Sequence, residues 1–356
     1  MNRIVFTGGG TAGHVTPNLA LIPVLRERGW EIHYIGTEKG MERELIAQEP
    51  GVTYHPIEGG KLRRYLSVKN ITDAFRVLRG IGQSASLIKK IRPTLVFSKG
   101  GFVSVPVVYG AWLHRVPVLL HESDMTPGLA NRLSKPFAKK LLCGFPEAAK
   151  LARKKGVYTG TPVRKELLNG SREAGKSLFG FDDSRPILLV TGGSSGAQAI
   201  NSALRSALPR LTELFQVLHL CGQGNLDPSL AGYPRYCQKE YLGTDEMAQA
   251  LACADAVVSR AGATTLCELL ALYKPTLLIP YPKAKTSRGD QILNAASFES
   301  RSLSRVLQQE DMTPETLVRE IVETYKNRGV LIDAMEKESC ADGLTNVLAE
   351  ILKYEK

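Results

Sequence analysis

Three glycines and a histidine near the start of the chain have the types and spacing of an anion-binding loop. Gly8, Gly10 and Gly13 follow a short apolar run, residues 4–6, and His14 comes directly after them. An apolar pattern at helical spacing then begins, which predicts strand, tight turn and helix. Such a unit directs backbone N–H groups and the positive end of a helix at one point, where a pyrophosphate fits. A plain strand–helix turn without a ligand has the same pattern, so both interpretations stay open.

His14, which we expect in the first turn of the predicted helix, is the first candidate for acid–base chemistry. Because the positive end of a helix disfavours the protonated ring, a neutral imidazole is expected beside the anion site, which suits a general base. Glu122 is the second candidate, either as the base or as a residue that orients it, and it follows a predicted strand at residues 116–120. A histidine that only caps its own loop is the alternative for His14.

A second strand–turn–helix signal lies at residues 259–268, which read SRAGATTLCE. Thr264 and Thr265 fall at the predicted helix start, where hydroxyls and N–H groups bind phosphate oxygens. Glu268 lies one helical turn later on the same face, and a carboxylate there would bind both hydroxyls of a ribose. An exposed helix glutamate without a ligand is the alternative. The pattern predicts a nucleotide site in the second half of the chain.

Two amides, Gln291 and Asn294, are three positions apart and share one face of a helix predicted over residues 287–297. Paired amides suit the hydroxyls of a sugar, and a solvated helix face is the alternative. No D-x-D sequence, the usual signature of a metal–diphosphate site, occurs in the chain. Neither a metal nor a cofactor is therefore predicted.

Strands alternate with helices along the chain, which predicts an α/β fold with parallel sheets covered on both faces. At residues 186–198 the chain starts again with strand, paired glycines and helix, and Gly192 lies 184 positions after Gly8. We therefore expect two Rossmann-like doubly wound domains, residues 1–163 and 164–340, with a last helix in residues 341–356 packed back on the first. The predicted strands are residues 4–6, 31–35, 94–97, 116–120, 140–143, 157–159, 186–190, 215–218, 236–241, 256–259 and 276–279.

The formal net charge of +11 arises in the first half of the chain. Residues 1–163 hold 24 Lys and Arg against 11 Asp and Glu, whereas residues 164–356 hold 22 against 24. Attraction to an anionic surface therefore belongs to the first half. No apolar run reaches transmembrane length, no signal peptide is recognised, and the six cysteines form no C-x-x-C pair. These features predict a cytoplasmic protein with reduced thiols.

Residues 61–92 combine nine basic residues with one acid, Asp73, and carry an apolar stripe at helical spacing. The pattern predicts a surface helix that attracts anionic lipid at about 1 kcal/mol per basic residue. An ordinary core helix with a basic solvated face is the alternative. The residues expected to meet a membrane or a lipid acceptor are Arg63, Arg64, Ile71, Phe75, Leu78, Arg79 and Phe102.

Seven motifs, in order along nearly the whole chain, resemble the MurG family, the peptidoglycan N-acetylglucosaminyltransferases of glycosyltransferase family 28. They read GGGTAGHVTP, KGGFVSVP, HESDMTPGLAN, GTPVR, GGSSGAQ, SRAGATTLCE and SRGDQILNA. The resemblance implies a GT-B fold, in which two Rossmann-like domains face each other across a deep cleft. It implies UDP-N-acetylglucosamine as the donor and undecaprenyl-pyrophosphoryl-N-acetylmuramyl-pentapeptide (lipid I) as the acceptor. It also implies peripheral attachment to the cytoplasmic side of the cell membrane.

The resemblance further implies how the reaction would run. His14 removes the proton from the C4 hydroxyl of the acceptor, and the oxygen attacks the anomeric carbon opposite UDP, with inversion. The departing diphosphate meets the helix start near Thr264 and the cation of Arg260. The donor contacts it implies are Thr11, Ala12, Gly13, Asp124, Arg164, Ser194, Thr244, Arg260, Gly262, Ala263, Thr264, Thr265, Glu268, Gln291 and Asn294. Three of them depart from the family pattern, namely Ala12, Asp124 and Thr244.

Three other functions share parts of this pattern. A nicotinamide dehydrogenase would use the first glycine loop, with Glu38 near the ribose, but the turns at Gly192 and Gly262 would then be superfluous. A UDP-N-acetylglucosamine 2-epimerase has the same two-domain shape but gives the basic apolar helix no purpose. A nucleic-acid binder would suit the basic first half. The basic stretch holds only two aromatic residues, Tyr65 and Phe75, so no nucleic-acid partner is predicted.

Overall fold

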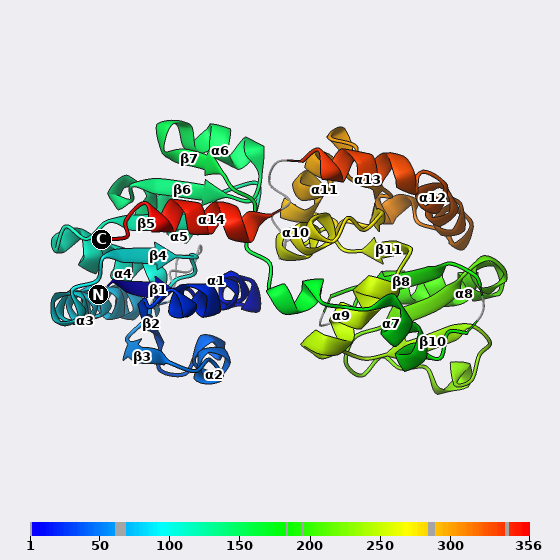
Figure 1. Ribbon diagram of the computed structural model, residues 1–356, viewed down its shortest axis with the longest axis horizontal. Helices are drawn as coiled ribbons and strands as arrows, with labels where there is room; N and C mark the ends of the chain where they lie inside the picture. The colour runs from blue at the N-terminus through cyan, green and yellow to red at the C-terminus, as the bar shows by residue number, and fades with distance from the viewer. Residues whose placement is uncertain (1, 61–68, 183, 194–195, 284–288, 339–341) are drawn as a thin grey trace. The chain divides into compact units, whose positions relative to one another are not determined.

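The computed structural model describes residues 2–60, 69–182, 184–193, 196–283, 289–338 and 342–356. The chain forms two compact units, each of which is considered by itself (Figure 1). Unit 1 comprises Met1–Arg164 together with Asp342–Lys356, and unit 2 comprises Lys165–Ala341. Arg164, assigned above to the second domain, is therefore the last residue before the chain enters unit 2.

Unit 1 is built on a parallel sheet whose described strands run in the order β3-β2-β1-β4-β5-β6-β7. The inner strands form because they are short apolar runs that are buried on both faces, whereas the two outermost strands, β3 and β7, are only partly buried. The strands are β1 (Arg3–Thr7), β2 (Glu31–Thr37), β3 (Val52–Ile57), β4 (Leu95–Ser98), β5 (Val118–Glu122), β6 (Lys140–Cys143) and β7 (Gly156–Tyr158). The helices are α1 (Thr16–Glu27), α2 (Met41–Ala47), α3 (Lys69–Ile91), α4 (Ser104–Leu113), α5 (Leu129–Ser134), α6 (Pro146–Ala152) and α14 (Gly343–Leu352).

The C-terminal helix α14 belongs to unit 1. Its side chains Val347 and Ile351 are fully buried in the same core cluster as α1 and the central strands. Asn346 donates a hydrogen bond to the carbonyl of Thr159 at 3.2 Å, and Lys140 of β6 pairs with Glu350 at 2.8 Å. Unit 1 is therefore closed by residues from both ends of the chain.

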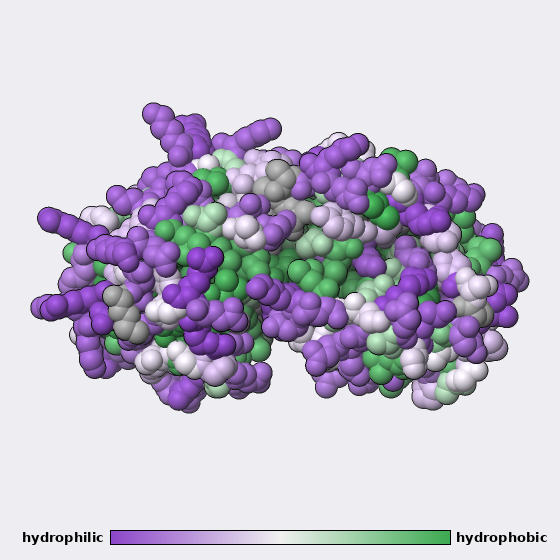
Figure 2. All heavy atoms as spheres, viewed as in Figure 1, coloured by the Kyte–Doolittle hydropathy of each residue, from purple (hydrophilic) through white to green (hydrophobic). Residues whose placement is uncertain are grey.

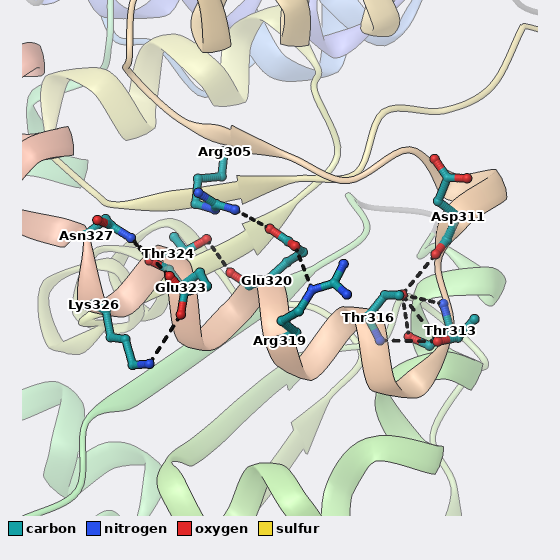
Figure 3. Close-up of polar contacts among 10 residues, drawn as sticks. All are labelled: Arg305, Asp311, Thr313, Thr316, Arg319, Glu320, Glu323, Thr324, Lys326 and Asn327. Carbon is teal, nitrogen blue, oxygen red and sulfur yellow. Dashed lines mark hydrogen bonds and ion pairs between the residues drawn. The ribbon is translucent and has the colours of Figure 1, made fainter.

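Unit 2 has a parallel sheet whose described strands run β10-β9-β8-β11-β12-β13. Helix α12 packs on its strands, and its start is held by the hydroxyls of Thr313 and Thr316 (Figure 3). Glu320 of α12 pairs with Arg305 of β13 at 2.5 Å. The strands are β8 (Ile187–Thr191), β9 (Gln216–Leu220), β10 (Tyr236–Lys239), β11 (Ala256–Ser259), β12 (Thr276–Leu278) and β13 (Arg305–Val306). The helices are α7 (Arg172–Phe179), α8 (Gln198–Leu214), α9 (Thr244–Cys253), α10 (Ala263–Ala271), α11 (Asp290–Ser300), α12 (Pro314–Lys326) and α13 (Arg328–Glu336).

The two sheets repeat one topology, which confirms the predicted α/β fold and its internal duplication. In both, the first strand is central, the next two strands continue to one side and the later strands to the other. The prediction missed β3 and β13. Strand β3 reads VTYHPI, and its proline and histidine weaken the apolar pattern of an edge strand. Strand β13 has only two residues, too few for any periodic signal.

Candidate functional site

Two glycine-rich loops of unit 1 pack against each other backbone to backbone. The first loop follows β1 and contains Gly8, Gly9 and Gly10; the second follows β4 and contains Gly100 and Gly101. The last glycine of the first loop and both of the second have positive φ angles of 88°, 94° and 83°, which glycine adopts without strain. A Cβ at Gly101 would overlap the carbonyl oxygen of Gly9. Both loops lie at the carboxyl ends of strands, where α/β sheets bind ligands.

The first glycine loop rests on Glu42 of α2, a buried carboxylate that the sequence analysis did not single out. Its Oε1 accepts hydrogen bonds from the backbone N–H and the hydroxyl of Thr37, at 3.0 and 2.6 Å. Its Oε2 accepts from the N–H of Gly10 at 3.4 Å. Glu42 therefore ties the end of β2 to the loop. A glutamate in a short helix usually is an exposed charge, so its role left no signal in the sequence.

Two tyrosines support the loop from the sheet side. The hydroxyl of Tyr34 donates to the carbonyl of Gly8 at 2.8 Å and accepts from the side-chain amide of Asn18 at 3.3 Å. Its ring stacks on Tyr54 with centroids 5.9 Å apart. Burial raises the pKa of both tyrosines, so both hydroxyls stay protonated and act as fixed donors.

His14 ends a short 3₁₀ turn, Ala12–His14, just before α1. The expectation that it lies inside the first turn of the helix is therefore wrong, because the chain tightens before α1 begins. The Nδ1 atom lies 3.2 Å from the carbonyl oxygen of Gly9 and 3.1 Å from Oγ1 of Thr11. Since a carbonyl oxygen can only accept, this contact favours the tautomer with the proton on Nδ1. The neutral ring then has its lone pair on Nε2, the form that a base acting through Nε2 requires.

Glu122 is buried and accepts hydrogen bonds from the loop that follows it. Its Oε1 accepts from the N–H of Asp124 at 3.1 Å. Its Oε2 accepts from the N–H of Gly128 at 2.8 Å and from the amide of Asn131 at 3.0 Å. Both carboxylate oxygens of Glu122 are therefore already engaged by N–H donors of the same unit. The geometry favours the orienting role for Glu122 over the role of base.

A buried lysine lies beneath the second glycine loop. Lys99 directly follows β4 and donates to Oγ of Ser123 at 2.6 Å. His121 lies nearby with Nε2 3.0 Å from the carbonyl oxygen of Gly160, and burial together with the charge of Lys99 lowers its pKa well below the usual value. His121 is therefore a neutral structural residue. Lys99 supplies a buried positive charge at the carboxyl ends of the strands, where the two glycine loops meet.

In unit 2, Thr265 and Glu268 line one cavity of about 180 Å³, as their spacing predicted. Gly193, at the turn after β8, lines the same cavity. Its apolar wall was not predicted, because Tyr241, Leu242, Met247, Leu251 and Leu269 look like ordinary core residues in the sequence. The cavity joins a carboxylate, a threonine hydroxyl and an apolar surface, which suits a nucleoside.

Helix α10 begins directly beside this cavity. Its N-cap is Gly262 in an extended conformation, and no side chain caps it. The first helical residues, Ala263, Thr264 and Thr265, carry N–H groups that lack partners within the helix. A helix start of this kind favours an anion such as a diphosphate.

Three predicted donor contacts of unit 2 have structural partners that the sequence did not reveal. The guanidinium of Arg260 is buried and donates to the carbonyls of Ile279 and Pro280 at 3.0 and 3.2 Å, and to Gln309 at 2.6 Å. Arg260 therefore holds the end of β12, so the expectation that it directly clamps a diphosphate is not supported by this geometry.

The two amides of α11 also bind backbone. Oε1 of Gln291 accepts from the N–H of Tyr281 at 2.9 Å, and the amide of Asn294 donates to the carbonyl of Ala261 at 3.2 Å. Asn294 is only 1% exposed. Asn294 therefore fixes the turn before α10, and the contact of the two amides with a sugar stays a prediction.

The remaining predicted donor contacts fall on turns and helix starts. Thr11 is exposed, Ala12 and Gly13 lie in the 3₁₀ turn, and Thr244 is the first residue of α9. Asp124 lies in the loop held by Glu122. Ser194 lies outside the described residues.

Exposed apolar side chains lie at two places on the helices α3 and α4, which pack together. Phe75 and Leu78 of α3 are 69% and 64% exposed, so the core-helix alternative is wrong for them. Trp112 and Leu113, at the end of α4, are also more than half exposed and were not predicted. Arg63 and Arg64 lie outside the described residues, as does the side chain of Ile71. Hydrophilic residues cover most of the outer edge of unit 1 in the face drawn in Figure 2.

The described residues contain neither a candidate membrane-spanning helix nor a candidate metal-binding cluster. No helix among them is both long enough and apolar enough to span a membrane. No group of three or more His, Cys, Asp or Glu side chains in the described part of the chain is arranged to hold a metal ion.

Comparison with known proteins gives matches along the whole chain. An enzyme of Clostridium kluyveri, named UDP-N-acetylglucosamine–N-acetylmuramyl-(pentapeptide) pyrophosphoryl-undecaprenol N-acetylglucosamine transferase, is 50% identical over 355 residues, which is 99% of this chain and 100% of that enzyme. The crystal structure of Acinetobacter baumannii MurG matches with a TM-score of 0.74 and 25% identity, covering 99% of this chain and 100% of that one. The structure of a Neisseria meningitidis UDP-GlcNAc 2-epimerase bound to UDP-GlcNAc matches with a TM-score of 0.69 but 11% identity, over 99% of both chains.

Two Rossmann-like units with these neighbours define the GT-B class of fold. The model of the glycosyltransferase family 28 N-terminal domain matches residues 4–143, and that of the C-terminal domain matches residues 187–350. The chain therefore belongs to glycosyltransferase family 28.

Proposed function

We propose that the chain transfers N-acetylglucosamine from UDP-N-acetylglucosamine to the C4 hydroxyl of the muramyl sugar in lipid I. The observation that carries the proposal is the full-length, 50% identity to an enzyme named for this transfer. The 2-epimerase alternative has only the fold in common with this chain, at 11% identity. The family membership therefore favours transfer over epimerisation.

Unit 2 is proposed to hold the donor. The ribose hydroxyls bind Glu268, the uracil enters the apolar part of the 180 Å³ cavity, and the diphosphate meets the start of α10 at residues 263–265. Arg260 acts through position, because it fixes the strand end beside which α10 begins. Further donor contacts are proposed at Thr11, Ala12, Gly13, Asp124, Arg164, Ser194, Thr244, Gln291 and Asn294, as the family resemblance implies.

The chemical step is proposed to use His14 as the base. Nε2 takes the proton of the C4 hydroxyl while the oxygen forms a bond to the anomeric carbon. The bond from that carbon to the UDP oxygen breaks on the opposite face, so the configuration inverts. Charge grows on the departing diphosphate, and the N–H groups of α10 stabilise it.

Unit 1 is proposed to hold the acceptor at the membrane surface. Its two glycine loops and the buried cation of Lys99 would receive the acceptor pyrophosphate. The exposed apolar side chains of α3 and α4, with Arg76 and Arg79, would contact the anionic inner leaflet of the cell membrane, so the protein attaches peripherally on its cytoplasmic side.

The test is transfer of labelled N-acetylglucosamine from UDP-N-acetylglucosamine to a short-chain lipid I analogue. We expect a product whose mass increases by one N-acetylglucosamine residue, with a β-1,4 linkage. A protein that binds UDP-N-acetylglucosamine and releases UDP or an epimer, without labelling the acceptor, would contradict the proposal. A thermal shift measured with UDP, NAD and single-stranded DNA separates the remaining alternatives, because only UDP should stabilise the protein.

A further inference from the structure

A cavity of about 1010 Å³ lies within unit 1 and is separate from the proposed donor site in unit 2. Its lining comes from the loop after β2 (residues 37–42), the end of β3 and the loop after it (residues 57–59), and one side of α3. Gly10 of the first glycine loop and Phe102, just after the second loop, complete the described lining. Two residues of the lining, Arg76 and Arg79, are proposed above to meet the membrane surface, but no ligand is assigned to the cavity itself.

Phe102 connects the cavity to the glycine loops. One edge of its ring lies against Gly10, where a Cβ would be 3.1 Å from Cε1. The other edge lies against Gly59, where a Cβ would be 3.0 Å from Cε2. The ring therefore fills the space beside two glycine backbones, and it forms a wall between the first glycine loop and the loop after β3. A ligand on the glycine loops would lie directly beside the cavity.

The lining offers both signs of charge and an apolar surface. Three cations, Lys39, Arg76 and Arg79, are accompanied by three carboxylates in the lining. Each carboxylate has a partner in the protein: Glu58 pairs with Arg79 at 3.0 Å, Glu38 pairs with Arg43, and Glu42 accepts from Thr37. Ile57 and Met41, like Phe102, supply apolar surface. A volume near the upper end of the usual range for ligand sites, about 300–1,000 Å³, is far more than one phosphate group fills. The lining therefore suits an extended ligand with carboxylates and apolar side chains, and a bare phosphate or a lipid headgroup would leave most of it empty.

We propose that this cavity binds the stem peptide of the acceptor. The inference rests on the proposed function, in which the acceptor's muramyl group carries a pentapeptide and its pyrophosphate lies on the glycine loops. A peptide attached through its amino end finishes in a free carboxylate, which Lys39 and Arg76 would bind as charge-assisted hydrogen bonds.

The experiment compares two water-soluble, short-chain acceptors, one with the pentapeptide and one with no peptide beyond the lactyl group. Soluble acceptors remove any contribution from membrane attachment. The variant is Lys39→Gln with Arg76→Gln, which removes two positive charges while keeping polar side chains of moderate length. The matched control is Lys89→Gln with Lys90→Gln, which removes two exposed charges from the far end of α3, away from the cavity.

We expect wild type and control to prefer the pentapeptide acceptor, and the variant to lose about tenfold in kcat/KM for it through a higher KM. The stem-free acceptor should change less than twofold in the variant, and free muramyl-pentapeptide should inhibit the control but not the variant. A variant that keeps the wild-type preference overturns the proposal. Equal losses of kcat/KM with both acceptors also overturn the proposal, because they would mean that the two cations bind the pyrophosphate, which both acceptors carry. Failure of wild type to transfer to either acceptor contradicts the proposed function instead, and an unchanged Tm with UDP present shows that the variant is folded.

Discussion

Replacing Glu42 should weaken the use of the acceptor without changing the affinity for UDP. Its buried carboxylate is the link between the end of β2 and the first glycine loop. In Glu42→Gln, one amide oxygen can still accept from Thr37. The other position becomes an NH₂ group, which faces the N–H of Gly10, so two donors meet where an acceptor is required.

These contacts set the loss of unfolding free energy that is expected in Glu42→Gln. Each hydrogen bond to a charged group contributes about 1.5–3 kcal/mol, and the 3.4 Å contact to Gly10 contributes least. A neutral amide is easier to bury than a carboxylate, which offsets part of the loss. We therefore expect unit 1 to lose about 2–4 kcal/mol of unfolding free energy. At about 2–4 °C per kcal/mol for a domain of this size, its Tm should fall by about 4–16 °C.

The assay follows unfolding by calorimetry and measures kcat/KM separately for acceptor and donor. Glu42→Gln should lower kcat/KM for the acceptor while leaving the affinity for UDP itself unchanged, because the uridine and the diphosphate are proposed to bind in unit 2. The control is Glu44→Gln, an exposed glutamate of the same helix, which should match wild type. A variant with normal stability, or one that loses UDP affinity first, would refute the supporting role assigned to Glu42.

The other predictions concern the base, the membrane surface, a helix cap and a buried histidine. His14→Ala should lower kcat by about 10²–10⁴-fold with UDP affinity unchanged, and near-normal turnover would disprove its role as base. Arg76→Glu with Arg79→Glu should release the protein from vesicles of anionic lipid in a sedimentation assay, and should have no effect with neutral vesicles. Thr313→Ala should cost unit 2 about 0.5–2 kcal/mol in denaturant unfolding, because it removes the cap of α12. Burial lowers the pKa of His219 to about 3. Below about pH 6.5 this histidine is protonated in the unfolded chain but stays neutral in the folded chain. The unfolding free energy of unit 2 should therefore fall by up to about 1.4 kcal/mol per pH unit as the pH falls from 6.5 toward 3. His219→Gln should flatten this slope, and an equally steep slope in the variant would contradict the assignment.

The duplicated α/β architecture and the location of the glycine turns could be predicted from the sequence because both depend on local patterns. Short apolar strands, glycines after them and helical periodicity occur within about twenty residues of one another. The pairing of Thr265 with Glu268 was predictable for the same reason, since helix geometry places residues three apart on one face.

The partners of buried polar groups could not be predicted, because they come from distant segments. Arg260 binds the strand end at Ile279, and Glu42 binds a glycine loop 32 residues away. An arginine after a strand reads as a ligand-binding cation in the sequence whether it faces a ligand or a carbonyl. Only the fold decides between these roles, because a buried cation is stabilised wherever carbonyl oxygens converge.

The duplication itself explains why each unit keeps a buried cation at the same place. Lys99 and Arg260 both follow the strand beside the central one, and both precede glycine and a helix start. Neither is mainly exposed to solvent, and both bind oxygen atoms of the protein. A charge held in this way does not have to move when an anion binds. The free-energy cost of reorganisation is therefore lower than it would be for water molecules around the same anion. The same strand–turn–helix unit is therefore suited to both proposed roles, an acceptor pyrophosphate in unit 1 and a donor diphosphate in unit 2. In unit 2 Arg260 would act by fixing the strand end beside which α10 begins, and not by contacting the diphosphate.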